Sequence, residues 1–190
     1  MSGRDAGPRY GDARAELVLR VARAQSGDRA ALERLLRDLQ GPLFHHVRSI
    51  ARDRDLALDA LQNSLLLIAR RLRSLRDPRW FKAWAYRIAT REAVRAAKRQ
   101  SAVDARWAEV ELADAVAAPE VEEPFDAGEI RAAIDRVDAL PPASAIVVRL
   151  HYLEEMTLAE IAEALESPVG TVKSRLAYGL GKLRGAMVGG

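Results

Sequence analysis

The chain has 190 residues, of which 49% are hydrophobic, and its 30 basic and 27 acidic side chains give a formal net charge of +3 at pH 7. That length allows one moderate core or two small ones. The absence of cysteine excludes disulfides, thiolate metal ligands and a cysteine nucleophile. Neither a bilayer-spanning apolar run nor a signal-peptide core is present in the sequence, so we expect a cytoplasmic protein with no membrane insertion.

Apolar residues recur at helical spacing along the chain, and strand-like alternation is nearly absent. Breaks at residues 26–27, 41–42, 52–53, 77–78 and 141–142 predict about five helices before a central acidic stretch and three or four after it. The sequence therefore predicts an all-α fold.

Residues 55–72 are expected to form a helix with two distinct faces. Its predicted core stripe comprises Leu58, Leu61, Leu65, Ile68 and Leu72. Asp59, Gln62 and Leu66 recur at spacings of three and four on a different face. An exposed leucine beside polar residues suits a contact with another protein, and burial against a neighbouring helix fits the pattern equally.

Residues 70–99 form a polycation in which only Asp77 and Glu92 are acidic. The basic residues are Arg70, Arg71, Arg73, Arg76, Arg79, Lys82, Arg87, Arg91, Arg95, Lys98 and Arg99. Within this segment a helix is expected from about residue 79 to residue 99. Its predicted core side comprises Phe81, Ala85 and Ile88.

A second face of that helix alternates aromatic and basic side chains. It is lined by Trp80, Arg87, Arg91 and Lys98, with Trp84 and Arg95 at its border. Indole rings can stack on bases and guanidinium groups can bind phosphates, which is the combination that a nucleic-acid single strand requires. The alternative is that the tryptophans belong to the core and the arginines only solubilise the helix. The preceding loop, residues 73–79, is placed to receive an unstacked base.

From residue 101 to residue 129 the charge reverses, with a single Arg106 among the acidic side chains. These are Asp104, Glu109, Glu111, Asp114, Glu120, Glu122, Glu123, Asp126 and Glu129. Pro119, Pro124 and Gly128 break any long helix there. We interpret the stretch as a solvated, flexible acidic linker; an acidic strand that follows a basic channel in a partner is the alternative. The predicted organisation is a flexible N-terminus (1–11), a helical domain (12–100), the linker (101–128) and a second helical domain (129–190).

Residues 157–176 are predicted to form two short helices joined by a tight turn. Thr157 and Glu160 have the spacing of a capping box, which predicts a helix that starts at Leu158. Ser167 is a good N-cap and Pro168 suits the first position of the next helix. The pattern is typical of a helix-turn-helix, here within a four-helix domain; an ordinary helical hairpin with a solvated outer face is the alternative.

The second of these helices should present a small, polar face fringed with cations. Its predicted buried side comprises Val169, Val172, Leu176, Leu180 and Leu183. Its outward side comprises Thr171, Ser174, Ala177, Tyr178 and Gly181, with Lys173 and Arg175 at the flanks. Small side chains let a helix enter a major groove, where Ser, Thr, Lys and Arg can reach base edges and phosphates.

Several of these segments resemble bacterial sigma factors of the extracytoplasmic-function (ECF) type. Residues 59–65 (DALQNSL) and 80–89 (WFKAWAYRIA) resemble region 2 of that family. Residues 140–142 (LPP), 152–153 (YL), 160–162 (EIA) and 170–176 (GTVKSRL) resemble region 4. In that family region 2 melts and binds the upstream hexamer near the start site and docks on the polymerase clamp, whereas region 4 reads the distal element and binds the flap.

The resemblance implies core RNA polymerase, duplex and single-stranded promoter DNA, and an anti-sigma factor as partners. The implied polymerase-binding residues are Asp59, Gln62, Asn63 and Leu66. The implied melting surface comprises Arg76, Arg79, Trp80, Trp84, Arg87, Arg91, Arg95 and Lys98. The implied readers of the distal element are Thr171, Lys173, Ser174, Arg175 and Tyr178.

Four positions depart from the family pattern. Asn63 stands where an acidic residue is usual, and is expected to weaken the clamp contact. Arg91 and Arg95 replace an Asn and an Asp, which predicts an unusual upstream-hexamer preference. Glu166 replaces a Gly in the turn of the helix-turn-helix, so a non-glycine residue is expected to have a positive φ.

Nothing in the sequence supports catalysis, and no cofactor or metal is expected. His45 and His46 are adjacent and His151 is remote, so they lack the spacing of a metal pair. The function predicted is that of a sigma factor rather than an enzyme. A stand-alone helix-turn-helix regulator and a sigma mimic that titrates an anti-sigma factor remain as alternatives.

Overall fold

The computed structural model describes residues 10–100, 128 and 134–188, and every regular element in these ranges is a helix. The first domain contains α1 (Tyr10–Gln25), α2 (Arg29–Ala51), α3 (Arg54–Arg71), the 3-10 turns η1 (Leu72–Ser74) and η2 (Pro78–Trp80), and α4 (Phe81–Gln100). The second contains α7 (Ile134–Asp138), α8 (Pro142–Tyr152), α9 (Leu158–Leu165) and α10 (Val169–Val188). The predicted acidic linker lies outside the described residues apart from Gly128.

Helix α2 runs through a position at which a break was expected. Pro42 lies inside the helix, while Leu39, Leu43, Val47 and Ile50 are buried along one side of it. Proline removes one backbone hydrogen bond but already has a helical φ, so continuous apolar packing on both sides of Pro42 keeps the helix intact. The described part of the first domain consequently has four α-helices, one fewer than expected. Asp28 caps α2 by accepting the backbone N–H of Ala31 at 3.0 Å.

The buried face of α3 is shifted from the predicted stripe. Ala57, Ala60, Ser64 and Ile68 are buried, whereas Leu58 is 38% exposed. Small residues take the inward positions because α3 packs against both α2 and α4. Helix α4 has buried alanines of its own at positions 83, 85, 89, 93 and 96. Alanine lets helix backbones approach closely, so the larger leucines of α3 lie at the edges of this contact.

The helix-turn-helix forms as the capping pattern predicted. Thr157 and Glu160 make a complete capping box, and α9 starts at Leu158. Glu166 ends α9 in the left-handed conformation (φ 52°, ψ 41°), as expected for a position where the family has glycine. Helix α10 begins at Val169, one residue later than predicted, and Val169 is 49% exposed rather than buried.

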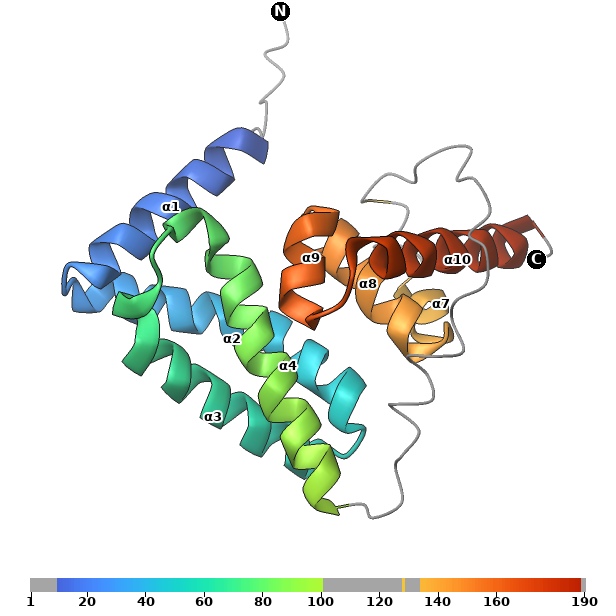
Figure 1. Ribbon diagram of the computed structural model, residues 1–190, viewed down its shortest axis with the longest axis horizontal. Helices are drawn as coiled ribbons and strands as arrows, with labels where there is room; N and C mark the ends of the chain where they lie inside the picture. Colours follow the sequence, from blue (N-terminus) through green and yellow to red (C-terminus); the bar gives the residue numbers. More distant parts are fainter. Residues whose placement is uncertain (1–9, 101–127, 129–133, 189–190) are drawn as a thin grey trace, which may run out of the picture.

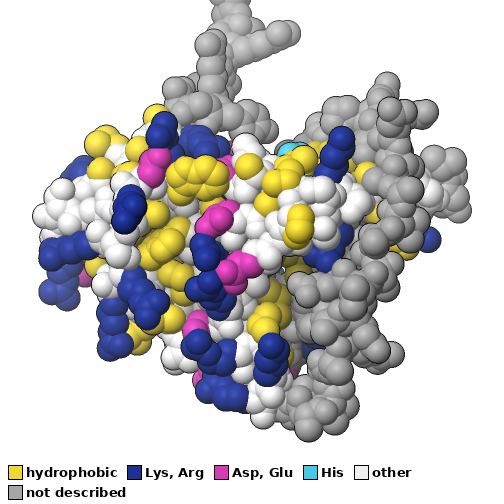
Figure 2. Space-filling model, viewed as in Figure 1, with side chains coloured by type: hydrophobic (Ala, Val, Ile, Leu, Met, Phe, Trp, Pro, Cys, Tyr) yellow, Lys and Arg dark blue, Asp and Glu magenta, His cyan; other side chains and the backbone are white. Residues whose placement is uncertain are grey.

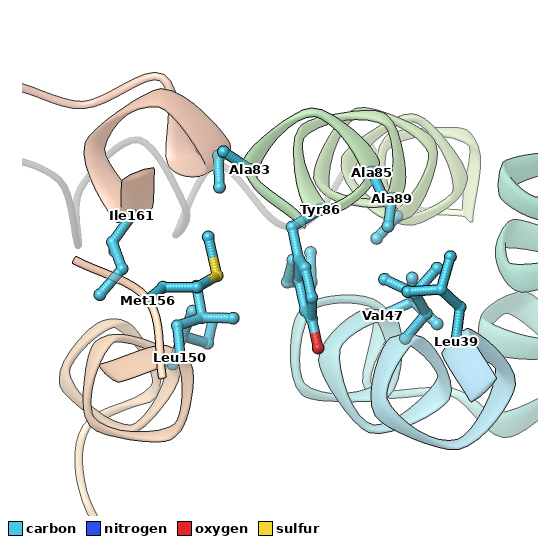
Figure 3. Close-up of a cluster of buried hydrophobic side chains, with 14 of the residues drawn as sticks. Leu39, Val47, Ala83, Ala85, Tyr86, Ala89, Leu150, Met156 and Ile161 are labelled. Atoms are coloured by element: carbon cyan, nitrogen blue, oxygen red, sulfur yellow. The ribbon is translucent and has the colours of Figure 1, made fainter. Parts of the chain in front are cut away.

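The two domains pack on one another, with α9 against α4 and α8 against α2 (Figure 1). Tyr86 of α4 extends between side chains of both domains, with Leu150 and Met156 on one side and Val47 on the other (Figure 3). Ala83 of α4 faces the cluster that contains Ile161, and all of these side chains are buried. The apolar core is therefore continuous from one domain to the other. Among the described helices none has both the length and the apolar character needed to cross a bilayer.

Candidate nucleic-acid and polymerase interfaces

The loop before α4 is held by one carboxylate. Asp77 accepts the backbone N–H of Arg79 at 2.9 Å and also binds its guanidinium, with Nη2 and Oδ2 2.7 Å apart. These side-chain and backbone hydrogen bonds from Arg79 lower the pKa of Asp77, and the same contact raises the pKa of Arg79. The Asp77–Arg79 contact orders the turn that presents Trp80, whose side chain is exposed (40%).

The two tryptophans of α4 and its preceding turn have different environments. Trp84 is partly buried, packs against the core and tilts over Phe81 with ring centroids 6.3 Å apart. Of the two, Trp80 is therefore the one that offers an open aromatic face for a base. For Trp84 the structure favours the core alternative.

The central cations of α4 bind carboxylates of the second domain. Arg87 bonds Glu163, and its Nε donates to Glu166 at 3.2 Å. Arg91 donates to both oxygens of Glu166, from Nε at 2.9 Å and from Nη2 at 2.5 Å. The Arg91 hydrogen bond lowers the pKa of Glu166, and Arg87 adds to the effect. Figure 2 shows basic and acidic side chains side by side where α4 meets α9.

Other interdomain contacts follow the same charge pattern. Lys82 donates to the backbone carbonyl of Glu154 at 2.6 Å, and Arg14 of α1 bonds the Glu160 carboxylate. The sequence reasoning missed these contacts. A signal was present, because Glu160, Glu163 and Glu166 recur every third residue and therefore place three carboxylates along one side of α9.

A cavity of about 720 Å³ opens between the C-terminal half of α4 and the second domain. Its apolar floor includes Ile50, Val94, Ile146 and Leu165. Basic side chains surround that floor; they are Arg91, Arg95, Lys98, Arg99 and Arg175. Arg95 also bonds Glu92 at 2.5 Å within α4. Three of the cations predicted to bind a single strand, Arg91, Arg95 and Lys98, thus line a hollow at the domain junction.

On α10 the structure separates the predicted distal-element readers. Lys173 is exposed, and Thr171, Ser174 and Tyr178 are half-buried; Ser174 donates its hydroxyl hydrogen to the Thr171 carbonyl at 3.0 Å. Arg175, in contrast, is only 5% exposed. Its place on the accessible flank was predicted wrongly, because this side of α10 faces the domain junction. Ala177 is also buried rather than outward.

The predicted polymerase face of α3 is open to solvent. Asp59, Gln62, Asn63 and Leu66 are all exposed, and Leu66 has a relative accessibility of 47%. Burial of this face against a neighbouring helix, the alternative reading, does not occur in the described residues. Exposed Leu58 and Leu66 give the face an apolar component suited to a protein partner.

Two of the three histidines make hydrogen bonds within the fold. His46 is buried and its Nε2 lies 2.8 Å from the Thr90 hydroxyl, whereas Nδ1 of His151 lies 2.9 Å from the Met156 carbonyl. Burial lowers the pKa of His46 to about 4. Within the described ranges no group of three His, Cys, Asp or Glu side chains could hold a metal ion.

Comparison with known proteins agrees with this geometry. Residues 35–103 match Sigma-70 region 2, and residues 137–185 match Sigma-70, region 4. The ECF RNA polymerase sigma-E factor of Salmonella typhimurium is 30% identical over 165 residues, which cover 82% of this chain and 86% of that protein. The chain belongs to the ECF family of RNA polymerase sigma factors. As a sigma factor it is a DNA-binding protein of transcription initiation.

Other members of the sigma factor family are more distant in sequence. The RNA polymerase sigma-H factor of Pseudomonas aeruginosa is 28% identical over 165 residues, and the sigma factor SigV of Bacillus subtilis is 26% identical over 156 residues. The solved structure of CnrH in complex with the cytosolic domain of CnrY superposes with a TM-score of 0.57 at 21% identity. It covers 91% of this ECF sigma factor and 97% of the CnrH chain, which supports the fold.

Proposed function

We propose that this sigma factor directs core RNA polymerase to promoters through three separate surfaces. The α4 surface, with the loop before it, melts and binds the upstream hexamer. The exposed face of α3 docks on the polymerase clamp, while the second domain reads the distal element through α10 and binds the flap. The domain boundaries proposed for this division are residues 12–100 and 129–190.

The observation that carries the proposal is the combination of exposed Trp80 with the cations of α4. A base can stack on the open indole face while guanidinium groups bind the adjoining phosphates. The proposed melting residues are Arg76, Arg79, Trp80, Arg87, Arg91, Arg95 and Lys98, and Trp84 borders them as a partly buried residue packed against the core. On α10, exposed Lys173 lies in the first turns, which reach base edges when such a helix enters the major groove.

The proposed partners are core RNA polymerase, promoter DNA in duplex and single-stranded form, and an anti-sigma factor in the cytoplasm. CnrH, which shares the fold, was solved in complex with the cytosolic domain of a second protein. This precedent supports a protein partner for the present chain.

Run-off transcription with purified core enzyme on a promoter library tests the proposal and identifies the promoter in one experiment. Specific transcripts that depend on the sigma factor are the expected result. Gel-shift assays with and without core polymerase separate the alternatives. A stand-alone regulator would bind promoter DNA tightly by itself. A sigma mimic would neither bind promoter DNA nor support transcription.

A further inference from the structure

Glu166 is the centre of the polar contact between the two domains. Its two carboxylate oxygens accept hydrogen bonds from Arg91, and one of them also accepts from Arg87. Both Glu166 and Arg91 occupy positions at which this chain departs from the pattern of the family that it resembles. The structure joins the two departures in one ion pair, 75 residues apart in the sequence.

We propose that Glu166 is an autoinhibitory latch that occupies the single-strand phosphate sites of α4 while the domains are packed. The inference rests on the proposed function, in which Arg87 and Arg91 bind the phosphates of the melted strand. A carboxylate and a phosphate both accept paired hydrogen bonds from one guanidinium fork. Arg91 therefore cannot bind Glu166 and a DNA phosphate through the same two N–H groups.

The geometry makes this latch weak enough to be released. The side chains of Arg91 and Glu166 are 54% and 41% exposed, so water and salt screen their attraction. The neighbouring Arg87–Glu163 pair is similarly accessible. Apolar contacts of α4 with the second domain bring the arginines and the glutamates together. The ion pairs then occupy the guanidinium groups that would otherwise bind phosphate.

The backbone at Glu166 supports a specific role for its side chain. A φ of 52° is disfavoured for residues other than glycine, and glycine would end α9 without strain. The glutamate instead directs a carboxylate from the turn of the helix-turn-helix toward α4. The turn that positions the recognition helix is thereby tied to the melting surface of the other domain.

The 190-residue chain is suited to a direct test because it contains no cysteine. Two cysteines can be introduced to carry a pair of fluorescent labels for distance measurement by energy transfer. One is Gln40→Cys, at an exposed position of α2, and the other is Gly185→Cys on α10, where an added Cβ meets nothing within 4 Å. The test variants are Glu166→Gln and Arg91→Gln. Glu33→Gln is the matched control, because it removes one carboxylate from an exposed ion pair, with Arg29, that lies entirely within α2.

Both test variants should increase the population with separated domains. Glu166→Gln removes two surface ion pairs and should do so by roughly twofold to thirtyfold, whereas Arg91→Gln removes one and should do so by roughly 1.4-fold to fivefold. Their effects on a mixed-sequence single-stranded DNA oligonucleotide, measured by fluorescence anisotropy without polymerase, should be opposite. Glu166→Gln should raise the affinity by a similar factor, whereas Arg91→Gln should not raise it. The control should change neither quantity.

An unchanged domain separation in Glu166→Gln would overturn the latch. Increased separation without a gain in single-strand affinity would also overturn it, since Glu166 would then not compete with DNA. Wild-type run-off transcription distinguishes a failure of the underlying function. If the wild-type chain supports no specific transcription while Glu166→Gln still separates the domains, the proposed function is wrong although the contact between the domains is real.

Discussion

Replacing Gly179 with alanine should destabilise the second domain through a steric clash with α8. A Cβ at this position would lie 2.9 Å from Cγ2 of Val148 and 3.4 Å from Cβ of Ser144. Both neighbours are completely buried, and valine has little freedom to change its χ1 angle within a helix. Overpacking of this kind costs about 1–3 kcal/mol, and the higher helix propensity of alanine recovers about 0.5–1 kcal/mol.

The net expectation for Gly179→Ala is a loss of about 0–2.5 kcal/mol in the free energy of unfolding, with about 1 kcal/mol at the centre of that range, measured by urea denaturation with far-UV circular dichroism. Gly181→Ala is the control on the same helix, because a Cβ there meets nothing within 4 Å. That variant should gain about 0.5–1 kcal/mol from helix propensity alone. Equal stabilisation by both substitutions would show that α8 and α10 do not approach each other at Gly179.

Three further predictions concern separate features. Burial lowers the pKa of His46 from 6.5 to about 4, so the unfolded chain takes up the proton first as the pH falls below 6.5. Neutral His46 therefore contributes fully to the free energy of unfolding above pH 6.5, and this contribution declines toward pH 4 by ~3 kcal/mol in total. Urea denaturation at pH 7 and pH 5 should show about 2 kcal/mol of this loss in the wild type and a smaller loss in His46→Gln. Trp80→Ala should weaken single-strand binding by the polymerase holoenzyme by about 1–3 kcal/mol and leave the melting temperature unchanged; a drop in melting temperature would instead place the indole in the core. Asp59→Ala combined with Gln62→Ala should reduce core-polymerase binding in a pull-down at unchanged stability, because both side chains are exposed; equal recovery of polymerase would exclude this face as the clamp contact.

Local features of the fold were the most accurately predicted from sequence. The capping box at Thr157 and Glu160 fixed the start of α9, and the replacement of glycine by Glu166 correctly indicated a positive φ. These features depend on hydrogen bonds and steric contacts within a few residues, which the sequence displays directly. The ECF family membership was also predicted correctly, because its motifs occur in order along most of the chain.

Features that depend on neighbouring helices were predicted less well. The core stripe of α3 was displaced because Ala57 and Ala60 are buried between two helices, and helical periodicity alone favoured the leucines. Arg175 was placed on an accessible flank because the periodicity of α10 carries no information about α4, which lies beside it. The pairing of Arg91 with Glu166 was missed for the same reason, since periodicity describes one helix at a time. The proposed DNA and polymerase contacts remain predictions.

Tyr86 provides an optical signal for the arrangement of the two domains. Its ring meets His46 edge-on with centroids 5.0 Å apart, and it is only 1% exposed. Burial, together with the nearby Glu154 carboxylate of the second domain, raises the pKa of its phenol well above the ordinary value. Departure of the second domain would admit water and remove that carboxylate, so the phenol would ionise at a lower alkaline pH. The ultraviolet absorbance of phenolate in the unlabelled protein would then record each partner that separates the domains.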